Sequence, residues 1–259
     1  MAHTFIYEQV DAAKAKPADD GARKQVLLEG RSPIERLDTV YNELDPGAEC
    51  SPPLLDRRQR VLLFIKGSGE VRAAGKGFAI ERRAVFASYP TAPFTITAGD
   101  EGLQWIDFVI SMTDDDMQEL AGWEDKYPYF LSYYQSDLYD GKDGKPKKMF
   151  NRISIPPHLV PRVAMGAVDD TPPSYMKPHA HPPIDQFFFS FEENDFDLLL
   201  DDQVFPLKGN TLFYIPLGAS HGFDAVEGQR VHYLWVDFLA KPEDMQRMVN
   251  GHPLLGRKG

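Results

Sequence analysis

Short strand-like runs, separated by turn signals at regular intervals, are the feature that most restricts the fold of this chain. From about Leu37 onward, apolar runs alternate with turns rich in Gly, as at residues 67–69 and 75–77. The spacing between turns is roughly 8–12 residues, which is typical of all-β sandwiches and barrels. We therefore expect an all-β protein with antiparallel strands.

The same rhythm occurs twice along the chain, which indicates an internal duplication. Between the two strand-rich halves, Thr113 is a good N-cap for a short helix that Gly122 can end. The tyrosine-rich residues that follow read as a packed connection, because aromatic side chains need burial. The expected organisation is an arm over 1–36, a first barrel over 37–112, a connecting segment over 113–150, a second barrel over 151–240, and a short helix with a tail over 241–259.

Charge and composition exclude several classes of partner. The chain has 259 residues and a formal net charge of −11, with no block rich in Lys or Arg, so we expect no nucleic-acid or membrane partner. Its single cysteine, Cys50, excludes an intramolecular disulfide and a thiolate cluster. The N-terminus lacks a secretory pattern, and no apolar run approaches the length of a membrane span. We therefore expect a cytoplasmic protein.

Histidines spaced for a metal site lie in the second half. His179 and His181 are two residues apart, so their imidazoles share one face if the backbone is extended. Gln186 follows after a Pro-Pro bend, and His221 follows the sequence Pro-Leu-Gly-Ala-Ser. Three imidazoles and one amide oxygen would fill four of the six positions of an octahedral shell and leave two open for water or substrate. The pattern predicts a divalent metal, with Mn, Fe, Zn and Ni all open.

These residues resemble the two signature motifs of the cupin superfamily. His179, His181 and Gln186 match the first motif, and the segment from Gly209 through Pro216 and Gly218 to His221 matches the second. The resemblance implies two tandem cupin barrels of jelly-roll type with short helical connections, the first degenerate and the second metal-binding. The departure from the family pattern is Gln186, where glutamate is usual.

Two points about the predicted site stay open from the sequence. Asp185 is the fourth ligand instead of Gln186 if the strand register differs by one residue. Tyr175 and Lys177 precede the histidines by even steps, so strand alternation would place them on the ligand face as catalytic acid/base or substrate-anchoring groups.

The first half differs, because no histidine lies between His3 and His158. Residues 75–105 and 231–240 are similar to short stretches of bicupin uronate isomerases such as 5-deoxy-glucuronate isomerase. The apolar run Val61–Ile65 predicts a strand buried on both faces, and with it a homodimer.

Three functions are compatible with these patterns. The first is a metal-dependent isomerase, or a related lyase, that acts on a small carbohydrate acid through an enediolate; its substrate would be an anionic small molecule. The second is a non-haem iron cupin dioxygenase. The third is a non-catalytic protein that binds a small molecule such as a sugar.

Overall fold

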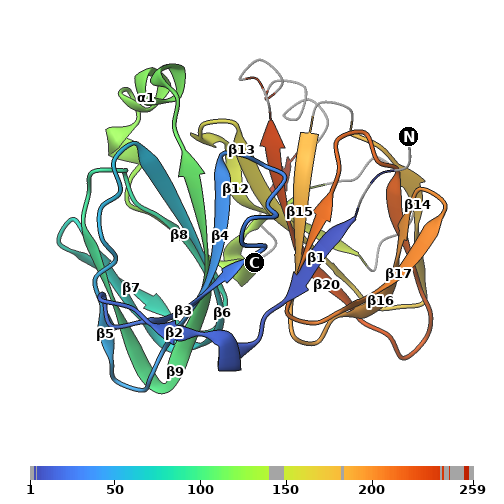
Figure 1. Cartoon of the computed structure of the whole chain (residues 1–259), viewed down its shortest axis with the longest axis horizontal. Helices are drawn as coiled ribbons and strands as arrows, with labels where there is room; N and C mark the ends of the chain where they lie inside the picture. Colours follow the sequence, from blue (N-terminus) through green and yellow to red (C-terminus); the bar gives the residue numbers. More distant parts are fainter. Residues whose placement is uncertain are drawn as a thin grey trace. The chain divides into compact units, whose positions relative to one another are not determined.

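The computed structural model describes residues 3, 5–139, 149–181, 184–239, 241, 245 and 254–256. The described chain divides into two compact units. We call Val10–Gln135 the N-terminal unit, and Met1–Gln9 together with Ser136–Gly259 the C-terminal unit. Both are built from antiparallel strands (Figure 1), as the spacing of the turns predicts.

The N-terminal unit is a sheet of nine strands with four short helical segments. The strand order is β10-β8-β6-β9-β4-β3-β2, with β5 paired to β9 and β7 paired to β6. The strands are β2 (Lys16–Pro17), β3 (Arg23–Leu27), β4 (Leu37–Leu44), β5 (Glu49–Cys50), β6 (Arg58–Ala73), β7 (Lys76–Ile80), β8 (Ala84–Ala87), β9 (Phe94–Ser111) and β10 (Tyr129–Ser132). The helical segments are η1 (Ala12–Lys14), α1 (Asp114–Leu120), η2 (Glu124–Lys126) and η3 (Tyr133–Gln135).

The long strands β6 and β9 let one sheet fold over on itself. Their mutual register shifts between Phe64 and Lys66 and again between Gly67 and Gly69, and such bulges bend a strand. At Gly67 a Cβ atom would lie 2.1 Å from the carbonyl oxygen of Gly102, so only glycine allows this close approach of the two strands. Side chains of both halves of β6 then enclose one apolar core with β9.

The predicted helix after the first barrel is confirmed. Thr113 is the N-cap of α1, and its side chain and that of Asp116 each accept a hydrogen bond from the other's backbone N–H. Three aspartates fill the first turn, where negative charge is favourable.

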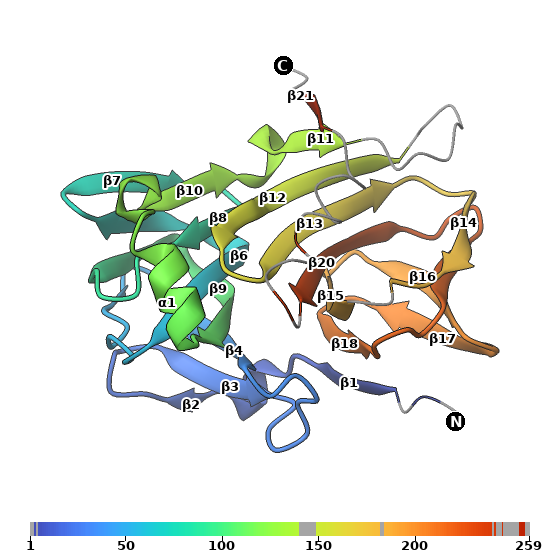
Figure 2. The same ribbon diagram turned by 90° about the horizontal axis from the view of Figure 1, so that it is seen from above.

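The C-terminal unit consists of two sheets. The larger has the order β1-β18-β15-β20-β13-β12-β11-β21, and the smaller β14-β19-β16-β17. Figures 1 and 2 show β14, β16 and β17 as a layer of their own beside the strands of the larger sheet. The strands are β1 (Ile6–Gln9), β11 (Asp137–Tyr139), β12 (Phe150–Val160), β13 (Val163–Asp170), β14 (Ser174–His179), β15 (Ile184–Ser190), β16 (Asp195–Leu200), β17 (Gln203–Lys208), β18 (Thr211–Ile215), β19 (His221–Ala225), β20 (Val231–Leu239) and β21 (Leu254–Gly256).

The core of the C-terminal unit lies between its two sheets. It contains Phe188 and Tyr233 from the larger sheet and Phe196 and Phe223 from the smaller one. Strand alternation therefore turns alternate side chains of β15 and β20 inward, and Trp235 shares this inward face. Such a two-layered arrangement leaves one end of the unit for a site built from strand ends and loops.

Several expected boundaries differ from those of the structure. Residues 10–36 are not a separate arm, because β3 pairs with β4 of the first barrel over Arg23–Leu27. The strand β1 pairs with β18 and so belongs to the second unit. The connecting segment is divided between the units at Gln135. The predicted C-terminal helix lies almost entirely outside the described residues, whereas Leu254–Gly256 forms β21.

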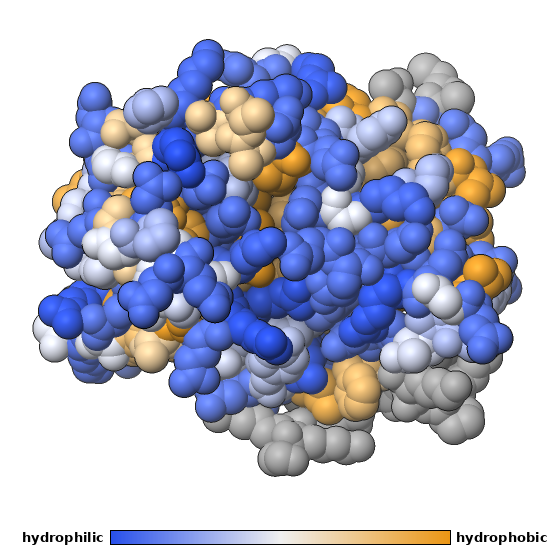
Figure 3. Space-filling model, turned by 90° about the horizontal axis from the view of Figure 1, so that it is seen from below, coloured by the Kyte–Doolittle hydropathy of each residue, from blue (hydrophilic) through white to orange (hydrophobic). Residues whose placement is uncertain are grey.

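The burial of β6 and the polarity of the surface bear on the predicted homodimer and on the expected absence of a membrane partner. Val61, Leu62, Leu63 and Phe64 are all fully buried in the single chain, so this run is buried on both faces without a second copy. On the face seen in Figure 3, apolar atoms form small separate groups among hydrophilic ones. The homodimer stays a prediction. In the described part of the chain, no helix is long and apolar enough to cross a membrane.

Candidate metal centre

Three histidines converge at one end of the C-terminal unit. His179 ends β14 and pairs across the sheet with His221, the first residue of β19. His181 follows in the adjoining loop, and its ring lies 4.8 Å from that of His179 and 5.3 Å from that of His221. One ring nitrogen from each lies within 4.8 Å of the others. The structure therefore brings together the three imidazoles that the sequence pattern selected.

Backbone carbonyls hold two of these imidazoles in a defined tautomer. The carbonyl oxygen of Lys177 lies 3.1 Å from Nδ1 of His179, and that of Ala219 lies 3.3 Å from Nδ1 of His221. A carbonyl can only accept, so each Nδ1 carries the proton and each Nε2 keeps its lone pair. This is the arrangement that a metal-binding histidine needs.

Burial keeps His221 uncharged. Its side chain is almost completely buried, and this burial, together with the neighbouring His179 and His181, lowers the pKa of His221 to about 3. The edge of Phe188 packs against its ring at 5.6 Å. His221 is therefore a neutral donor throughout the physiological range, and no proton has to be displaced from it when a metal binds.

Gln186 lies on the interior face, two residues from Phe188. It is buried in β15, and its Nε2 donates to Oδ1 of Asp237 in β20 at 2.5 Å. A carboxylate accepts hydrogen bonds, so this contact directs the NH₂ group toward Asp237 and leaves the amide oxygen for another partner. Gln186 as the fourth ligand stays a prediction, and the fixed amide supports it.

Asp185 faces the opposite side of β15. Its Oδ1 accepts a hydrogen bond from Tyr214 Oη at 2.7 Å, on the face that also carries Phe187. Because β15 begins at Ile184, alternation separates Asp185 from Gln186. The register that would make Asp185 a ligand is not the one in the structure.

Tyr175 and Lys177 do not share the ligand face as strand alternation predicted. Tyr175 is half exposed and pairs with the exposed Asp224, whereas Met176 packs on the core. The pairing of β14 with β19 shifts by one residue between Met176 and His179, and this bulge turns His179 inward. Lys177 lies exposed within the bulge. A catalytic role for Tyr175 or Lys177 stays a prediction, and it is not supported by a position on the ligand face.

Asp237 is a buried polar residue beside Gln186 to which the sequence interpretation assigned no role. Burial raises its pKa to about 7, and the hydrogen bond from Gln186 opposes this shift. A repeated tetrad is the signal that could have found it: Trp105-Ile106-Asp107-Phe108 in β9 corresponds to Trp235-Val236-Asp237-Phe238 in β20. Both aspartates are buried on the inward face of a central strand.

The registers of the two units show what replaces the metal ligands in the first. Leu62 pairs with Asp107 as Gln186 pairs with Asp237. Phe94 pairs with Ala73, the last residue before the two-residue turn between β6 and β7. In the same way, His221 pairs with Leu200, the last residue before the two-residue turn between β16 and β17. The N-terminal unit therefore carries Leu62 and Phe94 at the positions of Gln186 and His221, which is the expected degeneracy in physical terms.

The donor set fits a divalent transition metal. Nitrogen donors about 2.1 Å from one metal lie at most about 4.2 Å apart, so small rotations of these imidazoles suffice to close a shell. The set supplies neutral nitrogens and, with Gln186, a neutral oxygen, which suits Mn, Fe, Zn or Ni. The identity of the metal stays open.

A glutamate at position 186 tests the fourth ligand, but Asp237 changes how the test must be done. In Gln186→Glu two buried carboxyl groups would face each other and share a proton, so little negative charge is added. In Gln186→Glu/Asp237→Asn the asparagine amide can donate to the glutamate, and a full negative charge reaches the site. We expect the double variant to retain metal against a chelator better than wild type. Unchanged retention would show that residue 186 does not touch the metal.

The fold of the whole chain is similar to that of several solved cupin-fold structures. A Pseudomonas aeruginosa protein described as glyoxylate-induced matches with a TM-score of 0.75 at 10% identity, covering 93% of this chain and 91% of that one. The oxalate decarboxylase of Lactobacillus farciminis, in a formate complex, matches with a TM-score of 0.67 at 14% identity, covering 93% and 88%. The 7S globulin of Momordica charantia also matches with a TM-score of 0.67 at 14% identity, covering 91% and 84%.

These similarities establish the fold and leave the activity open. No protein-family model matches the sequence, and no curated protein is significantly similar to it. The structural matches extend over both units and confirm the predicted architecture of two jelly-roll barrels of the cupin type. The chain therefore has the cupin fold, with its histidine cluster in the second barrel.

Proposed function

We propose that this chain is a metal-dependent bicupin enzyme that acts on a small organic acid. The observation that carries the proposal is the convergence of His179, His181 and His221, with ligand nitrogens within 4.8 Å of one another. Three residues from a strand end, a loop and a second strand are held together here, and two of them are fixed by backbone carbonyls.

Charge favours an acidic substrate. The histidines are neutral donors, and Gln186 adds no negative charge where glutamate would. These ligands therefore neutralise none of the charge of a divalent ion, which would attract a carboxylate or a developing enolate more strongly than it would with an anionic ligand. The bound metal would supply Lewis acidity, lowering the cost of removing a proton beside a carbonyl group.

Neighbouring side chains hold the metal-binding groups in place. Asp237 holds the amide of Gln186, and Phe188 and Tyr233 form a closely packed floor with ring centroids 4.5 Å apart. Phe188 in turn supports the ring of His221. The rigid aromatic floor and the fixed imidazoles would keep the donors in place while the substrate changes charge.

The reaction we favour is isomerisation or a related elimination of a small carbohydrate acid. Removal of a proton next to a carbonyl group yields an enediolate, whose charge this centre is suited to stabilise. A second candidate is decarboxylation of a smaller acid, which is also a lyase reaction. It is favoured by the structural likeness to oxalate decarboxylases, one of them in complex with formate.

The two reactions are separated by their products. The metal-loaded protein would be incubated without oxygen with a panel of uronic acids and with oxalate, glyoxylate and related short acids. Incorporation of solvent deuterium into a uronic acid supports isomerisation, and release of CO₂ supports decarboxylation. Oxygen uptake in a parallel aerobic series would instead favour the dioxygenase, and saturable binding without turnover would favour a binding protein.

A further inference from the structure

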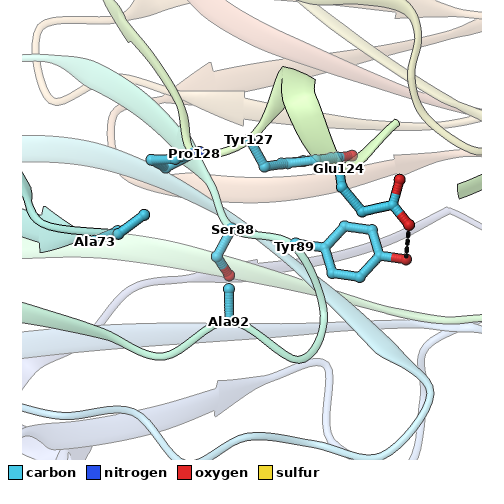
Figure 4. A pocket seen from close by; sticks show the side chains of 8 residues that line it. Ala73, Ser88, Tyr89, Ala92, Glu124, Tyr127 and Pro128 are labelled. Atoms are coloured by element: carbon cyan, nitrogen blue, oxygen red, sulfur yellow. Dashed lines mark hydrogen bonds between the residues drawn. The ribbon is translucent and has the colours of Figure 1, made fainter. Parts of the chain in front are cut away.

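A cavity in the N-terminal unit has the composition of a binding site. It has a volume of about 240 Å³ and lies where the ends of β6 and β8 meet the segment that contains η2. Figure 4 shows its lining side chains, with small apolar groups at one end and the rings of Tyr89 and Tyr127 running toward Glu124 at the other.

The polar end combines two aromatic rings with one carboxylate. The rings of Tyr89 and Tyr127 meet edge to face, with centroids 5.8 Å apart. The hydroxyl of Tyr89 points at Oε1 of Glu124, 3.5 Å away (Figure 4). The electron-rich faces of tyrosine rings attract cations, and a nearby carboxylate strengthens that attraction.

This carboxylate is exposed and forms no salt bridge in the described part of the chain. The salt bridges there do not include Glu124, and the nearest lysine in sequence, Lys126, lies over the ring of Trp123 at 4.2 Å from its centroid. Burial raises the pKa of both Tyr89 and Tyr127, so neither phenol adds negative charge near neutral pH. The cavity therefore presents one negative charge beside two neutral rings.

The other end of the cavity suits a small apolar group. Ala73, Ala92 and Pro128 line it with apolar atoms, and Ser88 adds a single hydroxyl group close to Ala92 (Figure 4). The position of the cavity in the barrel can be compared with that of the metal centre. Ala73 of the cavity pairs with Phe94, and Phe94 occupies the position that corresponds to His221. The cavity thus lies at the end of the first barrel that corresponds to the metal-binding end of the second.

We propose that this cavity binds a small organic cation, with an alkylated ammonium group held by Tyr89, Tyr127 and Glu124 and its alkyl part against Ala73, Ala92 and Pro128. The site is separate from the histidine cluster, and the proposal does not depend on the reaction catalysed there. The N-terminal unit would then carry a ligand site of its own, built from a carboxylate and aromatic rings in place of a metal.

Two molecules of equal shape test the proposal. Choline and 3,3-dimethyl-1-butanol differ only in whether the central atom is a charged nitrogen or a carbon, and the nitrogen of choline has no lone pair for a metal. We expect amide chemical shifts of the ¹⁵N-labelled full chain to change around residues 88–92 and 124–128 with choline. Binding of choline should be about fivefold tighter or more than that of the neutral analogue, as cation–π and ion-pair contacts at a partly exposed site would give.

Variants show whether the preference comes from this cavity. Glu124→Gln should remove most of the preference for choline, whereas Asp125→Asn, which removes the adjacent charge outside the cavity lining, should leave it unchanged. Ala92→Leu fills the cavity and should block both molecules. Equal binding of the two molecules by wild type, or an unchanged preference in Glu124→Gln, would overturn the proposal.

Discussion

Replacing His221 by alanine is expected to lower the metal content of the purified protein from near one per chain to near none. His221 is the buried member of the histidine cluster, and both of its partners lie within ring contact of it. Its loss removes one of three imidazoles and opens a cavity beside Phe188, so the remaining donors no longer close a shell. Elemental analysis after dialysis against a weak chelator measures the effect.

A matched control is an exposed histidine outside the cluster. His158 is exposed with a φ of 67°, so His158→Asn keeps a residue type that tolerates this backbone region. Its metal content should equal that of wild type. Equal metal in wild type and His221→Ala would mean that the histidine cluster is not the metal site. Thermal unfolding of both variants separates loss of metal from loss of fold.

Acidification is expected to release the metal, because its expected ligands include three histidines. A metal competes with protons for imidazole nitrogens, and His179 and His181 are less buried than His221. The low pKa of His221 means that this residue adds no protonation step above about pH 3.

The sequence allowed the fold and the three histidines to be predicted because both depend on local spacing. Turn signals at regular intervals specify strands, and an i, i+2 pair in an extended segment places two imidazoles together. His221 could be added because its spacing from the preceding glycine and proline matches a known motif. In each case, the prediction uses only spacings between residues that are near one another in the chain.

The surroundings of the site could not be predicted in the same way. The bulge between Met176 and His179 is a property of the pairing with β19, and it reversed the side of the strand expected for Tyr175. The contact between Gln186 and Asp237 joins residues 51 positions apart, and which face of β20 points inward is set by packing in the core. Both depend on long-range partners that alternation alone does not identify.

Asp107, the counterpart of Asp237 in the first barrel, has a different partner. It forms a buried ion pair with Arg60, and the exposed fractions of the two side chains are 4% and 11%. Leu62 occupies the position that corresponds to Gln186, so Arg60 reaches Asp107 from two residues earlier in β6. Burial raises the pKa of Asp107 to about 6, although Arg60 and Lys24 act to lower it.

Breaking this pair from the cationic side should strongly destabilise the protein. In Arg60→Met the carboxylate of Asp107 is left buried without its cation, and removal of one partner of such a pair costs about 3–5 kcal/mol. In Arg60→Met/Asp107→Leu neither charge of this pair remains to be buried, so most of the loss should be recovered. Urea unfolding of the two single variants, the double variant and wild type gives the coupling.

The pH dependence provides an independent check on the cause. The folded-state pKa of Asp107 lies above the ordinary aspartate value of 3.8, so the folded protein holds this proton more tightly than the unfolded chain. Its contribution to the free energy of unfolding therefore falls as pH rises from about 4 to 6. Without Arg60 the pKa rises further, so the loss in Arg60→Met should be larger at pH 8 than at pH 5.5. A loss of equal size at both pH values, or a double variant as unstable as Arg60→Met, would show that the buried charge is not the cause.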